Sequence, residues 1–163
     1  METIAVYWEP VIKTYGFQKK SDLSFIKIEI PENHLVDIGL RLREQKKIRI
    51  EYQFCELIPS ESKTLALFLL LERRREKDFE DAFQDLREKY VIESVSPVDL
   101  VFFQGPHFGD RYGIADAAFN ALLTKGIYFL LAGCSGASIY LVFQEGMGAK
   151  AILALNDTFQ TPI

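Results

Sequence analysis

The sequence contains few of the residues that build metal centres and disulfide frameworks. Its 163 residues include two cysteines, Cys55 and Cys134, and two histidines, His34 and His107. No pair of these four has the spacing of a metal-binding motif such as CxxC or HExxH. We therefore expect no metal site and no cofactor. Two isolated cysteines argue only weakly for a disulfide, and Cys55, inside an alternating apolar run, is expected to be a buried, reduced thiol.

Long apolar runs and an excess of basic charge are also missing. No segment reaches the roughly 20 apolar residues of a membrane span, and the N-terminus lacks the features of a signal peptide. The net charge of −4 is unsuited to a nucleic-acid surface, which needs basic groups to displace phosphate counterions. The basic run 73–75 is followed at once by acidic residues. These absences predict a cytoplasmic protein with no nucleic-acid or membrane partner.

The residues that are present suffice for a packed core, because 48% of the chain is hydrophobic and 13% aromatic. The length fits one ordinary domain or two small ones. Apolar periodicity predicts the order strand, helix, strand, strand, helix, strand after a turn at 19–22. The predicted ranges are strand 23–30, helix 33–45, strands 48–57 and 64–71, a helix whose apolar face runs from Phe79 to Tyr90, and strand 91–95.

The same order then restarts about 75 residues later, which indicates an internal repeat. The second copy comprises strand 100–103, helix 112–124, strands 127–131 and 138–143, and helix 147–159. It has no fourth strand, whereas the strand at 4–8 has no partner in the first copy. Because an open sheet edge is unfavourable, we expect that N-terminal strand to complete the second copy. The first copy would then be inserted within the second.

Five segments of the second copy resemble the ACT domains in the regulatory half of aspartate kinases. Tyr112–Ala115 resembles the proline-glycine-isoleucine/valine-alanine helix entry of that family. Phe119–Leu122 and Gly126-Ile127 resemble its aromatic-alanine-leucine and glycine-isoleucine-asparagine segments. Strand 138–143 and helix 151–159 follow its pattern as well. The resemblance covers almost the whole chain and is specific in the second copy.

The resemblance implies an α+β fold of two ferredoxin-like, ACT-like domains with helices on one face of each antiparallel sheet. The expected limits are 18–96 for the first domain and 97–163 for the second, which strand 3–9 completes. The first copy departs from the family, because His34-Leu35 stands where proline-glycine is usual. Residues 11–17 are extra. The kinase domain is missing, and no glycine-rich phosphate loop replaces it, so the resemblance implies a regulatory half without its enzyme.

The helix entry at residues 110–115 has the chemistry that an amino-acid effector requires. A helix N-terminus offers N–H groups and a positive dipole end to a carboxylate, and Asp110 could pair the ammonium. We expect a run of small residues, 133–137, to lie across from this helix entry. The predicted ligand-binding residues are Asp110, Arg111, Tyr112, Gly113, Ile114, Ala115, Gly133, Cys134 and Ser135.

Each of these features also has a purely structural interpretation. Asp110 could cap the helix, Gly113 could serve helix packing, and the small-residue run could be a turn. We therefore expect a non-catalytic module that binds a small effector such as an amino acid, forms a homodimer, and acts on a separate enzyme. The alternative is a ligand-free module for oligomerisation or protein interaction. An enzyme is a weaker third reading, because neither histidine stands in a catalytic motif.

Overall fold

The computed structural model describes residues 11–44, 50–60 and 63–161, and they divide into two compact units. One unit, which we call the continuous unit, is formed by residues 22–98. The other takes its described residues from 11–21 and 99–161, and we call it the split unit. Two long strands, β2 (Phe17–Pro31) and β5 (Ile92–Gln104), contribute residues to both units.

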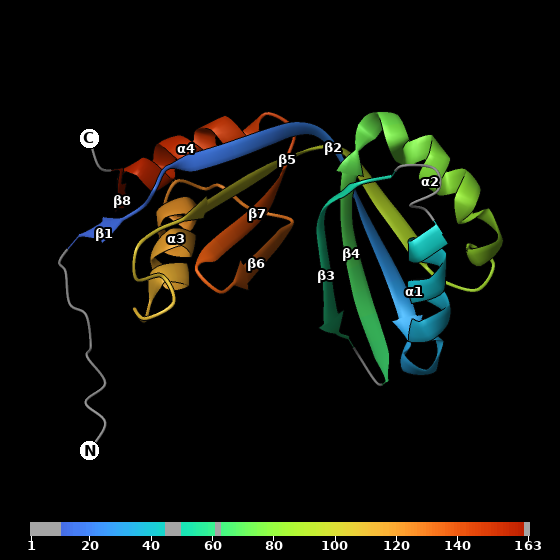
Figure 1. Cartoon of the computed structure of the whole chain (residues 1–163). Coiled ribbons are helices and arrows are strands. Elements are labelled where there is room, and N and C mark those ends of the chain that lie inside the picture. Colours follow the sequence, from blue (N-terminus) through green and yellow to red (C-terminus); the bar gives the residue numbers. More distant parts are fainter. Residues whose placement is uncertain (1–10, 45–49, 61–62, 162–163) are drawn as a thin grey trace, which may run out of the picture. The chain divides into compact units, whose positions relative to one another are not determined.

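The continuous unit contains a sheet with two helices on one face (Figure 1). Between β2 and β5 the chain forms α1 (Leu35–Glu44), β3 (Tyr52–Pro59), β4 (Thr64–Glu72) and α2 (Glu76–Ala82). The strand order is β3-β4-β2-β5, and β2 and β3 both pair antiparallel to β4. This is the predicted strand-helix-strand-strand-helix-strand order.

Alternation along the strands explains which face the helices cover. Ile26 and Ile28 of β2 lie opposite Leu69 and Leu67 of β4, and all four side chains are buried. Successive strand residues point to opposite faces, so these side chains share one face. The helices bury their own apolar residues against it. The buried core of this unit comprises Ile26, Ile28, Ile30, Ile38, Ile50, Leu67, Leu69, Leu71, Phe79, Phe83, Leu86 and Tyr90.

Three predicted boundaries in this region are wrong. The turn expected at 19–22 is part of β2, where residues 19–22 are exposed and charged or polar side chains can face solvent without ending the strand. The strands expected at 91–95 and 100–103 form one strand, β5, which continues through Pro97. The helix expected to extend to Tyr90 ends at Ala82 and is followed by a 3-10 turn at Gln84–Leu86. Cys55, expected to be buried, is exposed.

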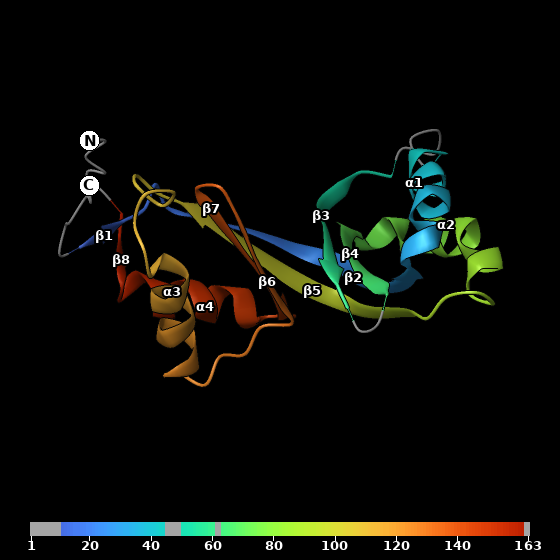
Figure 2. The same ribbon diagram turned by 90° about the horizontal axis from the view of Figure 1, so that it is seen from below.

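The split unit repeats the arrangement with α3 (Ile114–Leu123), β6 (Leu131–Ser135), β7 (Ser138–Gln144) and α4 (Met147–Asn156). The strand order continues as β2-β5-β7-β6, and α3 packs beside α4 (Figure 2). The helices and the sheet enclose a second buried core. It comprises Val101, Phe103, Phe108, Ile114, Ala118, Leu122, Ile127, Ile139, Leu141, Phe143, Ala151, Ala154, Leu155 and Phe159.

Two short strands join segments from opposite ends of the chain in this unit. β1 (Ile12–Lys13) pairs in parallel with β8 (Phe159–Gln160). The Phe17 ring, at the start of β2, lies with its centroid 4.9 Å from that of Phe103 and 6.4 Å from that of Phe159. The first residues of β2 therefore pack into the core of the split unit, and β2 is the neighbour of β5 in the sheet.

The predictions for this unit are partly correct. The last helix ends at Asn156 and not at Phe159, and a short strand follows it, so the expectation that the copy ends on a helix is wrong. The strand expected at 127–131 begins only at Leu131, although Ile127 is buried. The strand expected at 3–9 lies outside the described residues. The domain limits 18–96 and 97–163, and the insertion of one domain in the other, stay predictions.

Candidate ligand pocket

A pocket of about 230 Å³ lies in the split unit at the start of α3. The loop before the helix, the first residues of the helix, and the turn between β6 and β7 form its walls. It is lined by Phe108, Arg111, Tyr112, Gly113, Ile114, Ala115, Cys134, Gly136, Ser138 and Ile139. Its volume is below the roughly 300–1,000 Å³ of pockets for drug-sized molecules, so it suits a molecule of metabolite size.

The first turn of α3 offers backbone donors at the wall of this pocket. Gly113 is the N-cap, in the left-handed conformation with φ of 81°, and as a glycine it has no side chain with which to cap the helix. The first helical hydrogen bond runs from the Ala117 N–H to the Gly113 carbonyl at 2.9 Å. The N–H groups of the preceding residues therefore have no acceptor within the helix. Together with the positive end of the helix dipole they favour an anion.

The start of α4, in the same unit, is arranged differently. Gly146 is again a left-handed N-cap, with φ of 78°. Here the buried carboxylate of Asp99 accepts hydrogen bonds from the N–H groups of Gly146 and Gly148, at 3.1 and 3.0 Å. An internal anion thus occupies this position at α4, whereas no side-chain acceptor among the described residues does so at α3.

Arg111 is the one charged residue among the described residues that line the pocket. It is partly buried, and one of its guanidinium nitrogens donates to the carbonyl oxygen of Val11 at 3.2 Å. Its backbone N–H donates to the His107 carbonyl at 2.9 Å. A guanidinium carries five N–H donors in a planar fork, and the contact with Val11 uses one of them. The guanidinium can bind a carboxylate through a bidentate pair of hydrogen bonds.

The structure places six of the nine predicted site residues on the pocket wall: Arg111, Tyr112, Gly113, Ile114, Ala115 and Cys134. Asp110 does not line it and is not the N-cap of α3. Its side chain is 68% exposed, and its carboxylate lies 3.3 Å from His107 Nδ1. Gly133 is buried within β6, and Ser135 is exposed on that strand but does not line the pocket.

Sequence reasoning missed Phe108, Gly136, Ser138 and Ile139 on the pocket wall. Gly136 has φ of 57° and lies in the turn between β6 and β7. A glycine between two alternating apolar runs is the signal for such a turn. The run of small residues expected to lie across from the start of α3 includes this glycine, but the pattern does not show which of its residues line the pocket.

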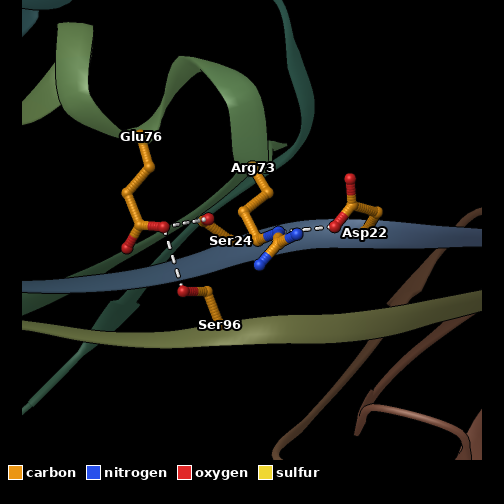
Figure 3. Close-up of polar contacts among 5 residues, drawn as sticks. All are labelled: Asp22, Ser24, Arg73, Glu76 and Ser96. Atoms are coloured by element: carbon orange, nitrogen blue, oxygen red, sulfur yellow. Dashed lines mark hydrogen bonds and ion pairs between the residues drawn. The ribbon is translucent and has the colours of Figure 1, made fainter.

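A second, more polar pocket of about 350 Å³ lies in the continuous unit and is lined by Glu51, Glu72, Arg74 and Arg75. Three of these four residues form local ion pairs, because Arg74 pairs with Glu72 at 2.6 Å and Arg75 with Asp78 at 2.7 Å. The surrounding polar groups are engaged as well (Figure 3). Arg73 pairs with Asp22 at 2.5 Å, and the Glu76 carboxylate accepts from Ser24 and Ser96 at 2.7 and 2.9 Å. These separate ion pairs and hydrogen bonds give most of the named polar groups a partner within the protein.

Other kinds of site are not indicated within the described residues. No group of three or more His, Cys, Asp and Glu side chains in that part of the chain is placed to hold a metal ion. No helix among these residues is long and apolar enough to cross a membrane.

Comparison with known proteins relates this fold to aspartate kinases. No family model and no curated protein matches the chain. Solved structures do match. The ligand-free regulatory subunit of aspartate kinase from Thermus thermophilus superposes with a TM-score of 0.76 at 10% identity, covering 90% of this chain and 99% of that one. Aspartate kinase from Synechocystis gives a TM-score of 0.80 at 16% identity, covering 93% of this chain and 27% of that one.

A third similar structure was solved with ligands. E. coli aspartokinase III, in complex with lysine and aspartate in its T-state, gives a TM-score of 0.66 at 11% identity. The match covers 93% of this chain and 34% of that one. At these identities the likeness shows the fold. The chain has the mixed α/β, ACT-like fold of aspartate kinase regulatory regions, and the resemblance inferred from the sequence is confirmed at that level.

Proposed function

We propose that this chain is a non-catalytic regulatory module that binds a small effector such as an amino acid in the pocket at the start of α3. The observation that carries the proposal is the pocket itself, which is lined both by the first residues of α3, with their backbone donors, and by Arg111. The likeness to isolated regulatory subunits of aspartate kinase supports a non-catalytic role. We propose that the module acts on a separate enzyme.

The chemistry of the pocket supports capture of a carboxylate. The N–H groups at the start of α3 and the guanidinium are both donors, and a carboxylate accepts from both kinds of group. Phe108, Ile114 and Ile139 are buried and provide an apolar wall for the rest of the ligand. Closure of the pocket around a ligand would favour one conformation of the module over another, which is what allosteric regulation requires.

A thermal shift screen of the proteinogenic amino acids tests this function. A ligand that binds only the folded state adds RT ln(1 + [L]/Kd) to the free energy of unfolding, which is about 1.4 kcal/mol at a tenfold excess over Kd. That corresponds to a few degrees in Tm for a protein of this size. We expect one or two amino acids to raise Tm.

Two neighbouring tryptophan substitutions show whether such a shift comes from this pocket. Cys134 lines the pocket and Ser135 does not, although both are exposed on β6. Cys134→Trp fills the pocket and should remove the shift, whereas Ser135→Trp points away from it and should retain the shift. A wild-type response from Cys134→Trp would place the ligand elsewhere. If neither an amino acid nor a small carboxylate without an amino group raises Tm of the wild type, the ligand-free assembly module becomes the better hypothesis.

We also propose that the module forms a homodimer. Val36 and Leu40, one turn apart on α1, are 72% and 52% exposed. Residues at i and i+4 share one helix face, and exposed apolar patches favour association. Light scattering should give twice the 18.7 kDa chain mass at micromolar concentration. A clean monomer would contradict the proposal.

A further inference from the structure

The distribution of charge around the pocket is one-sided. Arg111 lines it, and no aspartate or glutamate is among the described lining residues. The two nearest acidic residues in sequence are directed elsewhere. Asp110 is 68% exposed and close to His107, and Asp116 is exposed on the first turn of α3. The pocket therefore has a partner for a carboxylate but no carboxylate partner for an ammonium group.

An amino acid carries both a carboxylate and an ammonium group, so the lack of an acidic lining residue makes its binding less favourable. Moving an ammonium group out of water without a charged partner is unfavourable. The side-chain oxygens on the wall are hydroxyls, and that of Ser138 donates to Gln104 Oε1 at 3.5 Å, so an ammonium group would find only neutral acceptors among these side chains. A ligand that lacks the ammonium group loses no charged partner in this pocket and avoids the desolvation of that charge.

The rest of the wall favours an apolar body. Phe108, Ile114 and Ile139 line the pocket and are each at most 8% exposed. Burial of apolar ligand surface against them contributes roughly 25 cal/mol per Å². The volume of about 230 Å³ limits that body to a few carbon atoms beyond the carboxylate.

We propose that the pocket selects small monocarboxylates with an apolar body and does not recognise the amino group. The effector class would then be a short-chain carboxylic or 2-oxo acid, and lysine-like cationic ligands would be excluded. This inference rests on the proposed function, because it names the ligand class of the same pocket. The carboxylate would accept from the N–H groups at the start of α3 and from the Arg111 guanidinium.

Four probes of similar shape separate the contributions of the charged groups. They are 4-methylpentanoate, which has the carboxylate and the apolar body; L-leucine, which adds the ammonium; 3-methylbutylamine, which has the amine and no carboxylate; and L-lysine. Isothermal titration calorimetry on the full chain should show 4-methylpentanoate binding at least as tightly as L-leucine. The amine and L-lysine should not bind.

Substitutions then test whether the named residues cause this ranking of probe affinities. Arg111→Met should lower the affinity for 4-methylpentanoate by about tenfold or more, which is the scale of one lost charge-assisted hydrogen bond. Arg111→Lys should keep part of the affinity because it keeps the charge. Asp110→Asn should leave the affinity unchanged, because that carboxylate does not line the pocket. The Tm of each variant without ligand shows that it remains folded.

The outcomes distinguish this inference from the proposed function. Suppose that L-leucine or another amino acid binds while 4-methylpentanoate does not, and that Asp110→Asn weakens the binding of that amino acid. The selectivity inference is then overturned, and the regulatory pocket stands. If neither carboxylates nor amino acids bind the folded chain, the proposed function is overturned and the inference falls with it.

Discussion

Asp99 is a charged residue in an otherwise apolar part of β5, and its position explains why it is tolerated there. The side chain is 1% exposed, and its Oδ2 atom accepts two backbone hydrogen bonds from the start of α4. Charge-assisted bonds of this kind are about twice as strong as neutral ones, and the helix dipole adds to them. The carboxylate therefore acts as the N-terminal cap of α4 from a different element.

Replacement of Asp99 by alanine should destabilise the split unit. The buried N–H of Gly148 would lose its acceptor, and a buried donor without a partner costs about 1–3 kcal/mol. Chemical denaturation should show this loss as a lower midpoint at unchanged slope. The same substitution at Asp110 is the control, because that carboxylate is 68% exposed, and it should change the free energy of unfolding little. Equal effects would contradict the capping role.

Gly148 is the residue that allows this close approach. A Cβ atom there would lie 2.9 Å from Asp99 Oδ2 and 3.0 Å from Asp99 Cβ. Gly148→Ala should therefore lower stability, although alanine is favoured over glycine by about 1 kcal/mol in a helix interior. Combined with Asp99→Ala, Gly148→Ala should lower stability less, because the 2.9 Å contact with Oδ2 is removed and only the 3.0 Å contact with the Cβ of residue 99 remains. A double-mutant cycle of unfolding free energies measures that coupling, and strict additivity would show that no contact exists.

At the scale of elements, Glu76 fixes the first turn of α2 to two strands. Its Oε2 atom accepts from Ser24 on β2 and from Ser96 on β5 (Figure 3). Ser24 is fully buried, so its hydroxyl depends on this acceptor. One side chain thus holds a helix and two neighbouring strands together, which a seven-residue helix needs because short helices are marginal alone.

Glu76→Ala should destabilise the continuous unit by about 1–3 kcal/mol, since it leaves the buried Ser24 hydroxyl without its acceptor. Ser24→Ala in the same background should recover part of that loss, because the orphaned hydroxyl is removed with its partner. Urea unfolding of the two variants provides the comparison. If the double variant is less stable than Glu76→Ala by the full cost of Ser24→Ala alone, the two side chains do not interact.

The type and order of the elements could be predicted from periodicity, but their ends could not. The apolar face from Phe79 to Tyr90 identified buried residues correctly, yet α2 ends at Ala82, because the following turn buries Phe83 and Leu86 without a continuous helix. Likewise β2 and β5 are longer than their apolar patterns. Their exposed polar stretches pair with neighbouring strands, and a polar strand segment has no distinctive periodicity.

For the pocket, sequence reasoning identified the loop that forms one wall and failed on the geometry of Asp110. Arg111 to Ala115 are contiguous, so one motif located them together. The opposite wall comes from the turn between β6 and β7, and only tertiary packing determines which residues of that turn face α3. The direction of the Asp110 side chain depends on the loop backbone, which turns it toward His107. No spacing rule contains that information.

At the scale of the whole molecule, two separate apolar cores are built from one chain. The core of the continuous unit includes no residue of the split unit, and the reverse also holds. Segments at the two ends of the described chain meet in the split unit, where the Thr14 N–H donates to the Gln160 carbonyl and its hydroxyl to the Gln104 carbonyl, both at 2.8 Å. The stability of this unit therefore depends on contacts between residues about 145 positions apart in sequence.

Phe159 tests whether the two cores unfold separately. Its side chain is 1% exposed, and its ring centroid lies 5.1 Å from that of Phe103 and 6.4 Å from that of Phe17. Phe159→Ala should cost about 3–5 kcal/mol through lost burial and the cavity left behind. Because Phe159 belongs to the core of the split unit alone, hydrogen exchange should accelerate at amides of residues 139–143 while amides of residues 67–71 keep their protection. Phe79→Ala, in the other core, should produce the opposite pattern. Equal loss of protection in both ranges for either variant would show that the chain unfolds as one cooperative unit.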